Sequence, residues 1–438
     1  MLNIRYIREH ADKIKEAIVN KNITLDLAAL FVLDDQRKEI QTKISETRAK
    51  RNELAKVGKK GRPTPEQIEE GKQLKFDIAK LEETGKKIDD DYMALMVKVP
   101  MIPSEDTPIG KDDRENMEVY RWGEPTKFDF RPKSHIELGR DLDILDLERG
   151  AKVAGYRGYY VKNEAVALQM GLMMYAMRKL TVKGFLPMIP PTLIRGYALF
   201  GSGYFSGENY DQDVDEIYKV ANKEIDAAGN DQKEGKFLVG TAEPSLLAYY
   251  SNEVLDEKNL PMKFCGFSQC YRSEIGSHGK DTKGIYRVHE FMKVEQVCIV
   301  KADIEEADRL HQEMVSISRE LHEDLELPYR QLLICTGDMS TGKYKMFDLE
   351  VWIPSREGYG ETGSASNFLD WQSRRLNVRY KTKEGNKKFV YMINNTAIPS
   401  PRFLIAILEN YQQADGSVVI PKVLRKYMPG DLEVITRK

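Results

Sequence analysis

The chain has 438 residues, of which 41% are hydrophobic and 31% are charged, and its formal net charge is −2. This balance is typical of a soluble globular protein with two or three domains, and no apolar run approaches the ~18–20 residues that a membrane-spanning helix needs. The four cysteines lack C-x-x-C spacing, which argues against a disulfide framework or a zinc ribbon. We therefore expect a cytoplasmic protein without zinc and without a membrane partner.

The N-terminal hundred residues have a helical pattern. Residues 1–20 are predicted to form one amphipathic helix, because apolar side chains recur on one face. Two long stretches with heptad spacing follow, and residues 57–65, rich in Gly and Pro, separate them. The pattern predicts an antiparallel two-stranded coiled coil over about residues 27–100, formed by one chain folding back on itself. We place it in an N-terminal domain of residues 1–102, followed by a second domain of residues 103–438.

Positive charge is concentrated in the first of the two long helices. Residues 37–62 contain ten basic and three acidic side chains, so the rest of the chain has a net negative charge. Such a helix face often has no role beyond solvation. A projecting arm with basic side chains on one helix and at its tip is also suited to a phosphate backbone. The charge pattern alone leaves both interpretations open.

The remaining chain mixes strands and helices without regular alternation. A helix is predicted from about residue 165 to 183, and strand-like runs cover residues 264–271, 291–300, 345–353 and 389–393. This order favours an α+β domain with an antiparallel sheet flanked by helices over a doubly wound fold.

Familiar nucleotide and metal motifs do not explain the sequence. Residues Gly337 to Lys343 match the spacing of a phosphate-binding loop, but Tyr344 occupies the place of the hydroxyl residue that would bind magnesium. We interpret this match as a coincidence. His289-Glu290 lacks the second histidine of a zinc-protease helix.

Charged residues inside predicted strands are more informative. Arg272 and Glu274 point to one face of a strand, a Gly-rich basic loop follows, and the returning strand carries Phe291 and Glu295. Arg402 begins an apolar helix further along the chain. Each residue alone is more typical of a surface ion pair. Together they provide cations for phosphates, an aromatic ring for a purine, and carboxylates for a metal and an amino group.

The motifs in order resemble those of seryl-tRNA synthetases, a family of class II aminoacyl-tRNA synthetases, along essentially the whole chain. Residues 184–191, 272–291 and 394–409 resemble the three class II motifs. Further segments resemble the seryl enzymes in particular: residues 241–244, 279–284, 348–352, 366–375 and 416–421. The resemblance implies a class II catalytic domain in residues 103–438 and a tRNA-binding role for the coiled-coil domain.

The implied activity is that of a serine–tRNA ligase. The carboxylate of L-serine would attack the α-phosphate of ATP, giving seryl-adenylate and pyrophosphate, and the seryl group would pass to the 3′ end of serine tRNA. Mg²⁺ would accompany ATP. Serine tRNA would be bound through its long variable arm and its acceptor end. The sequence leaves open whether selenocysteine tRNA is also charged and how threonine is rejected.

The resemblance also assigns roles to individual residues. Catalytic roles are implied for Arg272, Glu361 and Arg402. The implied serine-binding residues are Thr241, Ala242, Glu243, Arg272, Glu295, Asn394 and Thr396. The implied ATP-binding residues are Arg272, Ser273, Glu274, Val288, Phe291, Glu361, Thr362, Gly363, Ser364 and Arg402. Glu361 and Ser364 would hold Mg²⁺, and the tRNA-binding residues would be Lys50, Arg51, Lys59, Lys60 and Arg62. A homodimer is expected through the first motif around Pro191.

Three positions depart from the common family pattern. Pro401 replaces a frequent glycine, Gly360 replaces a bulkier residue, and Gly363 replaces a frequent serine. These changes affect local geometry and leave the charged residues in place.

Three alternatives compete with this assignment. A homologue that passes the adenylate to a carrier protein would be expected to lack the coiled-coil arm. A non-catalytic RNA-binding or scaffold protein would be expected to lose Arg272, Glu295, Glu361 or Arg402. A threonyl or prolyl enzyme would be expected to carry an anticodon-reading domain after the third motif, where 36 residues follow Arg402.

Overall fold

The computed structural model describes residues 1–58, 64–222, 224–225, 228–232, 234–275 and 283–437. These fall into two compact units, Met1–Pro100 and Met101–Lys438. Over the described ranges, no helix combines the length and the apolar character that crossing a membrane requires.

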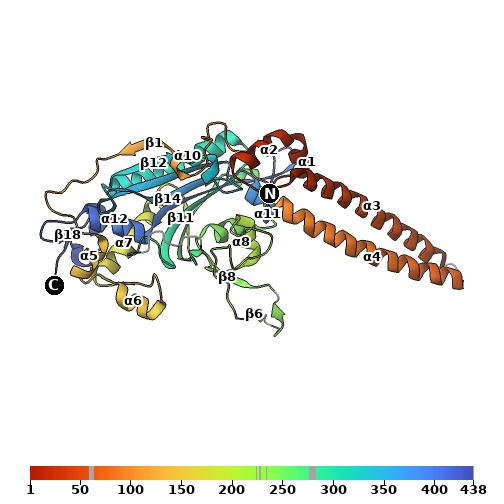
Figure 1. The fold of residues 1–438 in the computed structure, drawn as a ribbon, viewed down its shortest axis with the longest axis horizontal. Coiled ribbons are helices and arrows are strands. Elements are labelled where there is room, and N and C mark those ends of the chain that lie inside the picture. Colours follow the sequence, from red (N-terminus) through yellow and green to blue (C-terminus); the bar gives the residue numbers. More distant parts are fainter. Residues whose placement is uncertain (59–63, 223, 226–227, 233, 276–282, 438) are drawn as a thin grey trace. The chain divides into compact units, whose positions relative to one another are not determined.

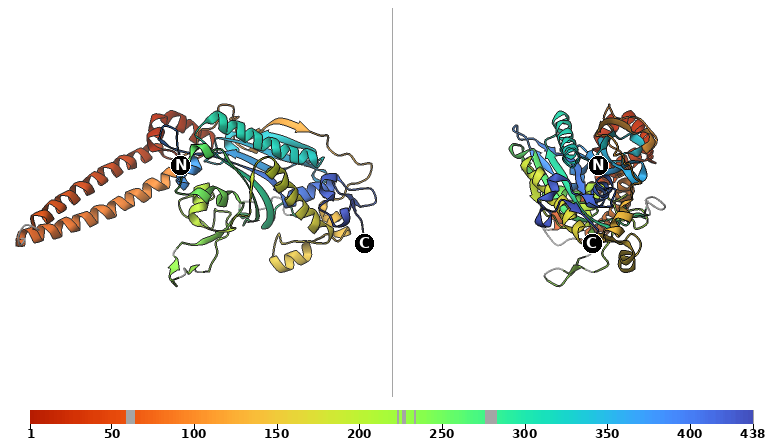
Figure 2. Two further views of the ribbon diagram at one scale, coloured as in Figure 1. Left: turned by 180° about the vertical axis from the view of Figure 1, so that it is seen from behind. Right: turned by 90° about the vertical axis from the view of Figure 1, so that its left-hand side faces the viewer.

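The first unit is a helical hairpin preceded by two short helices. The helices are α1 (Ile4–Glu9), α2 (Ala11–Asn20), α3 (Leu27–Gly58) and α4 (Pro65–Met96). Helices α3 and α4 run side by side along their length (Figure 1, Figure 2). A capping box of Thr64 and Gln67 begins α4. The predicted coiled-coil hairpin is confirmed.

The prediction of a single helix over residues 1–20 is wrong. His10 has φ −117° and ψ 31°, outside the helical region, and separates α1 from α2. Its ring stacks on Tyr6 with centroids 4.1 Å apart, and Nδ1 lies 3.0 Å from the Tyr6 carbonyl oxygen. These local contacts favour the break over a continuous helix.

The hairpin packs as its heptads predict. Ile40 and Ile44 of α3 are buried opposite Gly85 of α4, where an added Cβ would lie 3.6 Å from Ile44 Cδ1. Arg37 pairs with Asp89 at 2.5 Å and lies 4.0 Å from the ring of Tyr92. The residues predicted to bind tRNA lie further along the hairpin than Arg37. Lys50 and Arg51 are exposed, and Lys59, Lys60 and Arg62 lie outside the described residues.

The second unit is built on one eight-stranded sheet. Its order is β1 (Met117–Trp122), β12 (Tyr329–Leu333), β13 (Lys345–Ile353), β14 (Gly358–Asn367), β17 (Tyr391–Pro399), β11 (Glu290–Val300), β10 (Met262–Tyr271) and β4 (Leu186–Met188). Every neighbouring pair is antiparallel except β10 and β4, which are parallel. The α+β class and the strands predicted at 264–271, 291–300 and 345–353 are confirmed.

The strand predicted over residues 389–393 is divided between two strands. The chain leaves one sheet and enters another at Val390, so β16 (Lys387–Phe389) and β17 are separate strands. β16 pairs with β15 (Arg379–Lys381), which also pairs with β9 (Val254–Asp256). The other short strands form two-stranded sheets: β2 (Leu145–Asp146) with β3 (Tyr160–Val161), β5 (Leu193–Arg195) with β8 (Lys236–Leu238), β6 (Glu224–Ile225) with β7 (Asp231–Gln232), and β18 (Val418–Val419) with β19 (Val434–Ile435).

Three of the helices, α7, α10 and α12, cover one face of the large sheet. The helices of this unit are α5 (His135–Asp141), α6 (Leu147–Ala154), α7 (Glu164–Val182), α8 (Gly196–Ser202), α9 (Glu243–Leu247), α10 (Ile304–Asp324), α11 (Trp371–Leu376), α12 (Ser400–Asn410) and α13 (Lys422–Arg425). Gln296 of β11 donates to Ser318 of α10, and Gln169 of α7 lies 3.7 Å from the sulfur of Met292. The helix predicted over 165–183 corresponds to α7, within one residue at each end.

Two β-bulges set which side chains face away from these helices. Thr362 is an extra residue between Glu361, opposite Glu350, and Gly363, opposite Leu349. Glu361 and Ser364 therefore face the same side of the sheet although they are three residues apart. A second irregularity at Ala397 acts similarly on β17, between Thr396 and Ile398.

The segment that resembles a phosphate-binding loop has a different structure. It begins within a short 3₁₀ turn, Thr336–Asp338, and the chain continues into β13 at Lys345 rather than into a helix. The interpretation of this motif as a coincidence is confirmed.

Candidate active site

A cavity of about 480 Å³ lies on the sheet face that α7, α10 and α12 leave free. Its walls come from the ends of β10 and β11, from β14 and β17, and from the start of α12. The residues that line it are Arg272, Glu274, Tyr286, Arg287, Val288, Phe291, Lys293, Glu361, Thr362, Gly363, Thr396, Pro399, Pro401 and Arg402. Most of the residues predicted to bind ATP are thus brought together. Ser273 and Ser364 are not among the lining residues.

Arg402 and Glu361 form the charged centre of one wall. Arg402 Nη1 donates to the Glu361 carbonyl oxygen at 2.8 Å and lies 3.2 Å from its Oε2. Burial alone would raise the pKa of Glu361, but the charges of Arg402 and Arg272 hold it below its ordinary value. The Glu361 side chain is 44% exposed, so its carboxylate stays ionised and accessible from the cavity.

Tyr286 supports this pair. Its hydroxyl donates to the Glu361 carbonyl oxygen at 3.3 Å, and its ring centroid lies 4.7 Å from the Arg402 guanidinium. An added Cβ at Gly360 would be 2.9 Å from the Tyr286 hydroxyl oxygen. The departure from the family pattern at Gly360 therefore provides the space that the Tyr286 ring occupies.

The opposite wall contains Arg272 and Phe291. Arg272 follows β10, donates through Nε to the Gly240 carbonyl oxygen at 3.3 Å, and lies 5.7 Å from the Phe291 ring centroid. Glu274 is buried in a left-handed conformation with φ +56° and pairs with Arg287 at 2.8 Å. The cavity is thus lined by a paired carboxylate and a partly exposed aromatic ring, residue types suited to a purine base.

Three oxygen-bearing side chains lie together on β13 and β14. Asp348 faces Ser364 across the strand pair, and the bulge at Thr362 adds Glu361 to the same face. Burial and the charge of Glu361 raise the pKa of Asp348 well above its ordinary value. Asp348 Oδ1 is buried and has no hydrogen-bond partner within the described part of the chain.

This donor set fits Mg²⁺. Carboxylate and hydroxyl oxygens are ligands of the type it prefers, and magnesium sites of nucleotide enzymes use one or two carboxylates plus phosphate oxygens and water. Among the residues that the structure describes, no three His, Cys, Asp or Glu side chains are arranged to hold a metal by themselves. The residues here would hold Mg²⁺ together with a bound nucleotide.

A more buried cluster of polar side chains, which we call the serine pocket, adjoins the cavity. Three donors converge on Glu295 Oε2: Thr241 Oγ1 and Thr396 Oγ1, each at 3.2 Å, and Lys293 Nζ at 2.7 Å. Since Lys293 and Thr396 also line the cavity, they connect the two spaces.

Glu243 is the second carboxylate of this pocket. It accepts hydrogen bonds from Gln372 Nε2 at 2.7 Å, Asn394 Nδ2 at 2.9 Å and the Tyr204 hydroxyl at 2.9 Å. Burial and the negative charge of Glu295 raise the pKa of Glu243 to about 7. Lys293 already pairs with Glu295, so a cationic group placed near Glu243 would favour the ionised form of that carboxyl.

Two residues predicted to bind ligands, Thr362 and Ala242, make side-chain contacts with the protein itself. The Thr362 hydroxyl lies on the helix-covered face, 2.8 Å from His322 Nε2 and 3.1 Å from the Leu349 carbonyl oxygen, so the bulged backbone of Thr362 is what borders the cavity. The Ala242 methyl is buried against Gly266, where an added Cβ would lie 3.0 Å away. Its contribution is to seat α9 close to the sheet.

Sequence reasoning missed several residues of the site. Lys293 carried a usable signal, because it precedes Glu295 by two residues on one strand and must share its face. Tyr286 and Asp348 lie inside segments that resemble the family motifs, but the resemblance assigns neither of them a role. Tyr204 and Gln372 belong to distant segments, and no local pattern shows that they meet at Glu243.

Sequence comparison matches residues 1–103 to the seryl-tRNA synthetase N-terminal domain and residues 218–411 to the tRNA synthetase class II core domain (G, H, P, S and T). The chain is 43% identical to a serine–tRNA ligase of Borrelia garinii subsp. bavariensis over 433 residues, 98% of both proteins.

Solved structures agree with the sequence matches. The crystal structure of seryl-tRNA synthetase from Pyrococcus horikoshii complexed with ATP has a TM-score of 0.85 and 33% identity over 100% of both chains. The cytoplasmic serine–tRNA ligase of Naegleria fowleri in complex with AMP has a TM-score of 0.80 and 28% identity over 98% of this chain and 96% of its own. With matching domains in order and near-complete coverage, the chain belongs to the seryl-tRNA synthetase family of class II aminoacyl-tRNA synthetases.

Proposed function

We propose that this chain is a serine–tRNA ligase that activates L-serine with ATP and transfers the seryl group to serine tRNA. The observation that carries the proposal is the junction of two spaces at Lys293 and Thr396. One space has three arginines and two aromatic rings, suited to a nucleotide, and the other has two carboxylates and two threonine hydroxyls, suited to a small hydroxyamino acid. The relatives whose structures contain ATP and AMP support the nucleotide assignment.

In the activation step, a carboxylate oxygen of serine forms a bond to the α-phosphorus of ATP while the bond to the pyrophosphate oxygen breaks. Arg272 would bind the α-phosphate and the serine carboxylate, and Arg402 would bind the γ-phosphate. Positioning and charge neutralisation by such preorganised groups supply most of the catalysis in phosphoryl chemistry. Mg²⁺, held by Glu361 and Ser364 with the phosphates, would supply further neutralisation of the departing pyrophosphate.

Serine recognition would rest on the pocket around Glu295. Thr241, Thr396, Glu243 and Glu295 would surround the ammonium and hydroxyl groups of the amino acid. Alanine would make none of the hydrogen bonds that the serine hydroxyl would make with these groups, so a site that uses such bonds discriminates against it. The site thereby favours a hydroxyamino acid over an apolar one of similar size.

The N-terminal unit would bind the tRNA. Its family match is to a seryl-tRNA synthetase domain, and the exposed Lys50 and Arg51 lie near the end of α3. We assign Lys50, Arg51, Lys59, Lys60 and Arg62 to phosphate contacts with the long variable arm of serine tRNA. The acceptor end would receive the seryl group from the adenylate on its terminal adenosine.

We further propose a cytoplasmic homodimer formed around Pro191. The segment leading to it exposes large apolar side chains, including Val182 at 80% and Ile189 at 82%. Exposed apolar side chains grouped on one segment are typical of a protein interface. Light scattering at micromolar concentration would give the mass of two chains, whereas an active monomer would contradict the assignment.

The central test is ATP–pyrophosphate exchange with each standard amino acid in turn. Serine alone should support rapid exchange, and serine tRNA should then accept labelled serine. Exchange with another amino acid in preference to serine, or none with serine, would overturn the proposed function.

A further inference from the structure

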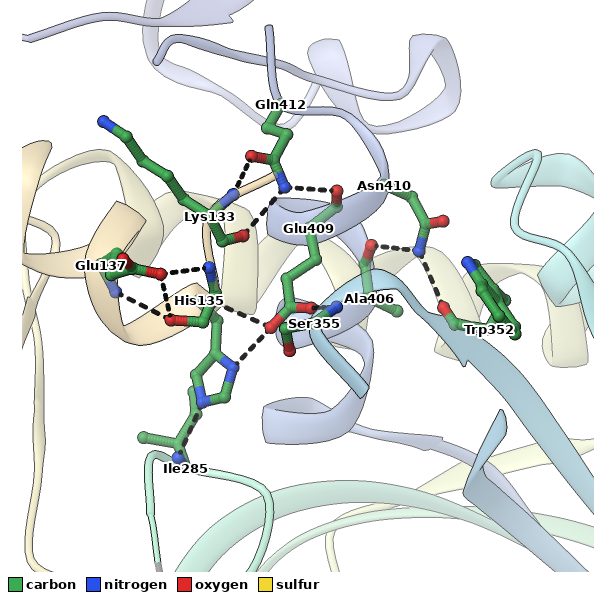
Figure 3. Close-up of polar contacts among 11 residues, drawn as sticks. Lys133, His135, Glu137, Ile285, Trp352, Ser355, Ala406, Glu409, Asn410 and Gln412 are labelled. Carbon is green, nitrogen blue, oxygen red and sulfur yellow. Dashed lines mark hydrogen bonds and ion pairs between the residues drawn. The ribbon is translucent and has the colours of Figure 1, made fainter. Parts of the chain in front are cut away.

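His135, the first residue of α5, joins two segments of the candidate active site that are far apart in sequence (Figure 3). Its backbone N–H and its ring Nδ1 both lie within hydrogen-bond distance of Glu409 Oε1, at 2.8 Å and 2.7 Å. On the other side of the ring, the Ile285 backbone N–H donates to Nε2 at 3.3 Å. The side chain is buried, with 9% of its surface exposed.

These partners define the protonation state of the imidazole. Because the Ile285 amide can only donate, Nε2 must carry a lone pair and no proton. Nδ1 then carries the proton and donates to Glu409. Burial would raise the pKa of Glu409, but hydrogen bonds from His135 and Ser355 hold it below its ordinary value, so the acceptor is a carboxylate. The arrangement makes Nδ1 the donor to Glu409 and Nε2 the acceptor from Ile285.

The chain on the far side of His135 leads directly to Arg402. Ile285 precedes Tyr286, whose carbonyl oxygen accepts from Arg402 Nε at 3.5 Å and whose ring faces the Arg402 guanidinium. Gly284 packs so closely on the imidazole that an added Cβ would lie 2.0 Å from Nε2, and its φ of +72° also favours glycine.

Glu409 is also connected with Arg402, because both belong to one helix. It belongs to α12, the helix that begins at Ser400 and carries Arg402 in its first turn, and its other oxygen accepts from the Ser355 N–H at 2.9 Å. His135 therefore connects the distal end of α12 with the backbone immediately before Tyr286.

From this geometry we propose that His135 is a positioning residue for ATP: its ring holds Ile285 so that Tyr286 supports Arg402 and Glu361. The inference rests on the proposed function. It predicts that a change at His135 acts on the nucleotide side of the site and leaves serine binding unaffected, because the serine pocket has no contact with this network among the described residues.

Two substitutions separate the two hydrogen bonds of the ring. In His135→Gln the amide oxygen can take the place of Nε2 and accept from Ile285, whereas in His135→Asn the shorter amide can reach Glu409 only. Exchange kinetics should show a rise of about tenfold in KM for ATP in His135→Asn, with KM for serine unchanged, since the loss of one positioning hydrogen bond is typically worth a factor of this order. His135→Gln should recover most of the loss.

Gln412→Ala is the matched structural control. The Gln412 side chain bonds the Lys133 backbone, just before α5, at 2.6 Å and 2.9 Å, and it donates to the Glu409 carbonyl oxygen at 2.9 Å (Figure 3). These bonds involve neither the Glu409 carboxylate nor Ile285. This variant should lower the melting temperature without changing KM for ATP. A second probe, Gly284→Ala, displaces the imidazole from the loop side and should reproduce the rise in KM for ATP even where His135→Asn folds poorly.

The experiments distinguish a failure of the proposed function from a failure of the inference about His135. If the unaltered chain shows no serine-dependent exchange, the proposed function fails. If the unaltered chain exchanges normally, the inference alone is refuted by equal changes in both KM values, by the absence of any change in His135→Asn and Gly284→Ala, or by a KM effect in Gln412→Ala.

Discussion

Lys293 and Glu295, two residues apart on β11, form an ion pair of 2.7 Å in which both side chains are almost completely buried. Removing one partner of such a buried ion pair destabilises the folded chain, because the remaining charge has neither water nor an opposite charge beside it. We expect Lys293→Met to reduce the free energy of unfolding by roughly 3 kcal/mol and to raise KM for serine. Urea unfolding and pyrophosphate exchange would measure the two effects.

Lys263→Met provides a matched control for this change. Lys263 pairs with Glu313 at 2.6 Å from the neighbouring strand β10, but both side chains are partly exposed. Loss of the Lys263–Glu313 pair should reduce the free energy of unfolding by at most about 1 kcal/mol and leave KM for serine unchanged. Equal destabilisation by the two variants would contradict the burial argument.

Replacing Arg272 or Arg402 of the nucleotide cavity should nearly abolish activation. In Arg402→Lys or Arg272→Lys the planar fork that can bind phosphate in a bidentate manner is lost, and we expect serine-dependent exchange to fall by roughly 10²-fold. Arg309→Lys, at an exposed position on α10, is the control and should retain full exchange. Near-normal rates in both cavity variants would show that the phosphates bind elsewhere.

The pH dependence of serine binding should follow Glu243. With its pKa raised to about 7, a large fraction of the empty sites carry a protonated Glu243 near neutral pH. The serine ammonium favours the ionised form, so KM for serine should rise as the pH falls from about 8 to 6, while KM for ATP stays nearly constant. Steady-state exchange at several pH values would measure both.

Glu243→Gln tests whether this carboxyl is responsible. The variant should have a raised KM for serine that no longer changes over the same pH range. A pH dependence that persists in the variant would assign the titration to another group.

The coiled-coil hairpin should be separable from the activation chemistry. Replacement of residues 30–98 by a short Gly/Ser linker should leave serine-dependent exchange largely intact and abolish tRNA charging, because none of the proposed ATP or serine residues lies in it. Undiminished charging by the shortened chain would show that the arm has no role in tRNA binding.

A milder change tests the basic helix itself. Lys50→Gln with Arg51→Gln should weaken tRNA binding and lower the slope of log K against log salt by roughly one for each phosphate that the variant no longer neutralises. Lys75→Gln with Lys80→Gln removes the same charge from exposed positions of α4 and should have a smaller effect. Equal effects would indicate a general electrostatic contribution rather than a basic face on α3.

The sequence predicted the long-range architecture because its signals are periodic. Heptads identified α3 and α4, and alternating or apolar runs identified β10, β11 and β13, the last with its observed bounds Lys345–Ile353. Errors occurred where a single residue interrupts such a pattern. His10 breaks the first helix through contacts with Tyr6, and Val390 marks a change of sheet that a run of apolar residues does not show.

The candidate site was predictable where residues are close in sequence. Arg272, Glu274 and Phe291 are close because the chain returns on itself as a hairpin. The prediction that Arg272 and Glu274 share one face of a strand is wrong, since both follow β10, which ends at Tyr271, and Glu274 has φ +56°. The contacts of Tyr204 and Gln372 with Glu243 depend on how distant segments fold over the sheet. The bulge at Thr362 is a backbone feature with no clear signature in its side chain, and without it Glu361 and Ser364 would be assigned to opposite faces.

Through Thr362, that bulge also connects the face that carries Glu361 and Ser364 with a histidine on the opposite face of the sheet. His322, against the Thr362 hydroxyl, has its pKa lowered to about 4 by burial, so the folded chain keeps it neutral. An unfolded chain takes up a proton at this histidine at higher pH, and the stability that neutral His322 contributes is lost as the pH falls from about 6.5 towards 4. Mild acid should therefore loosen the strand that carries Glu361 and Ser364 from its covered face, and His322→Gln should make thermal stability less sensitive to pH in this range.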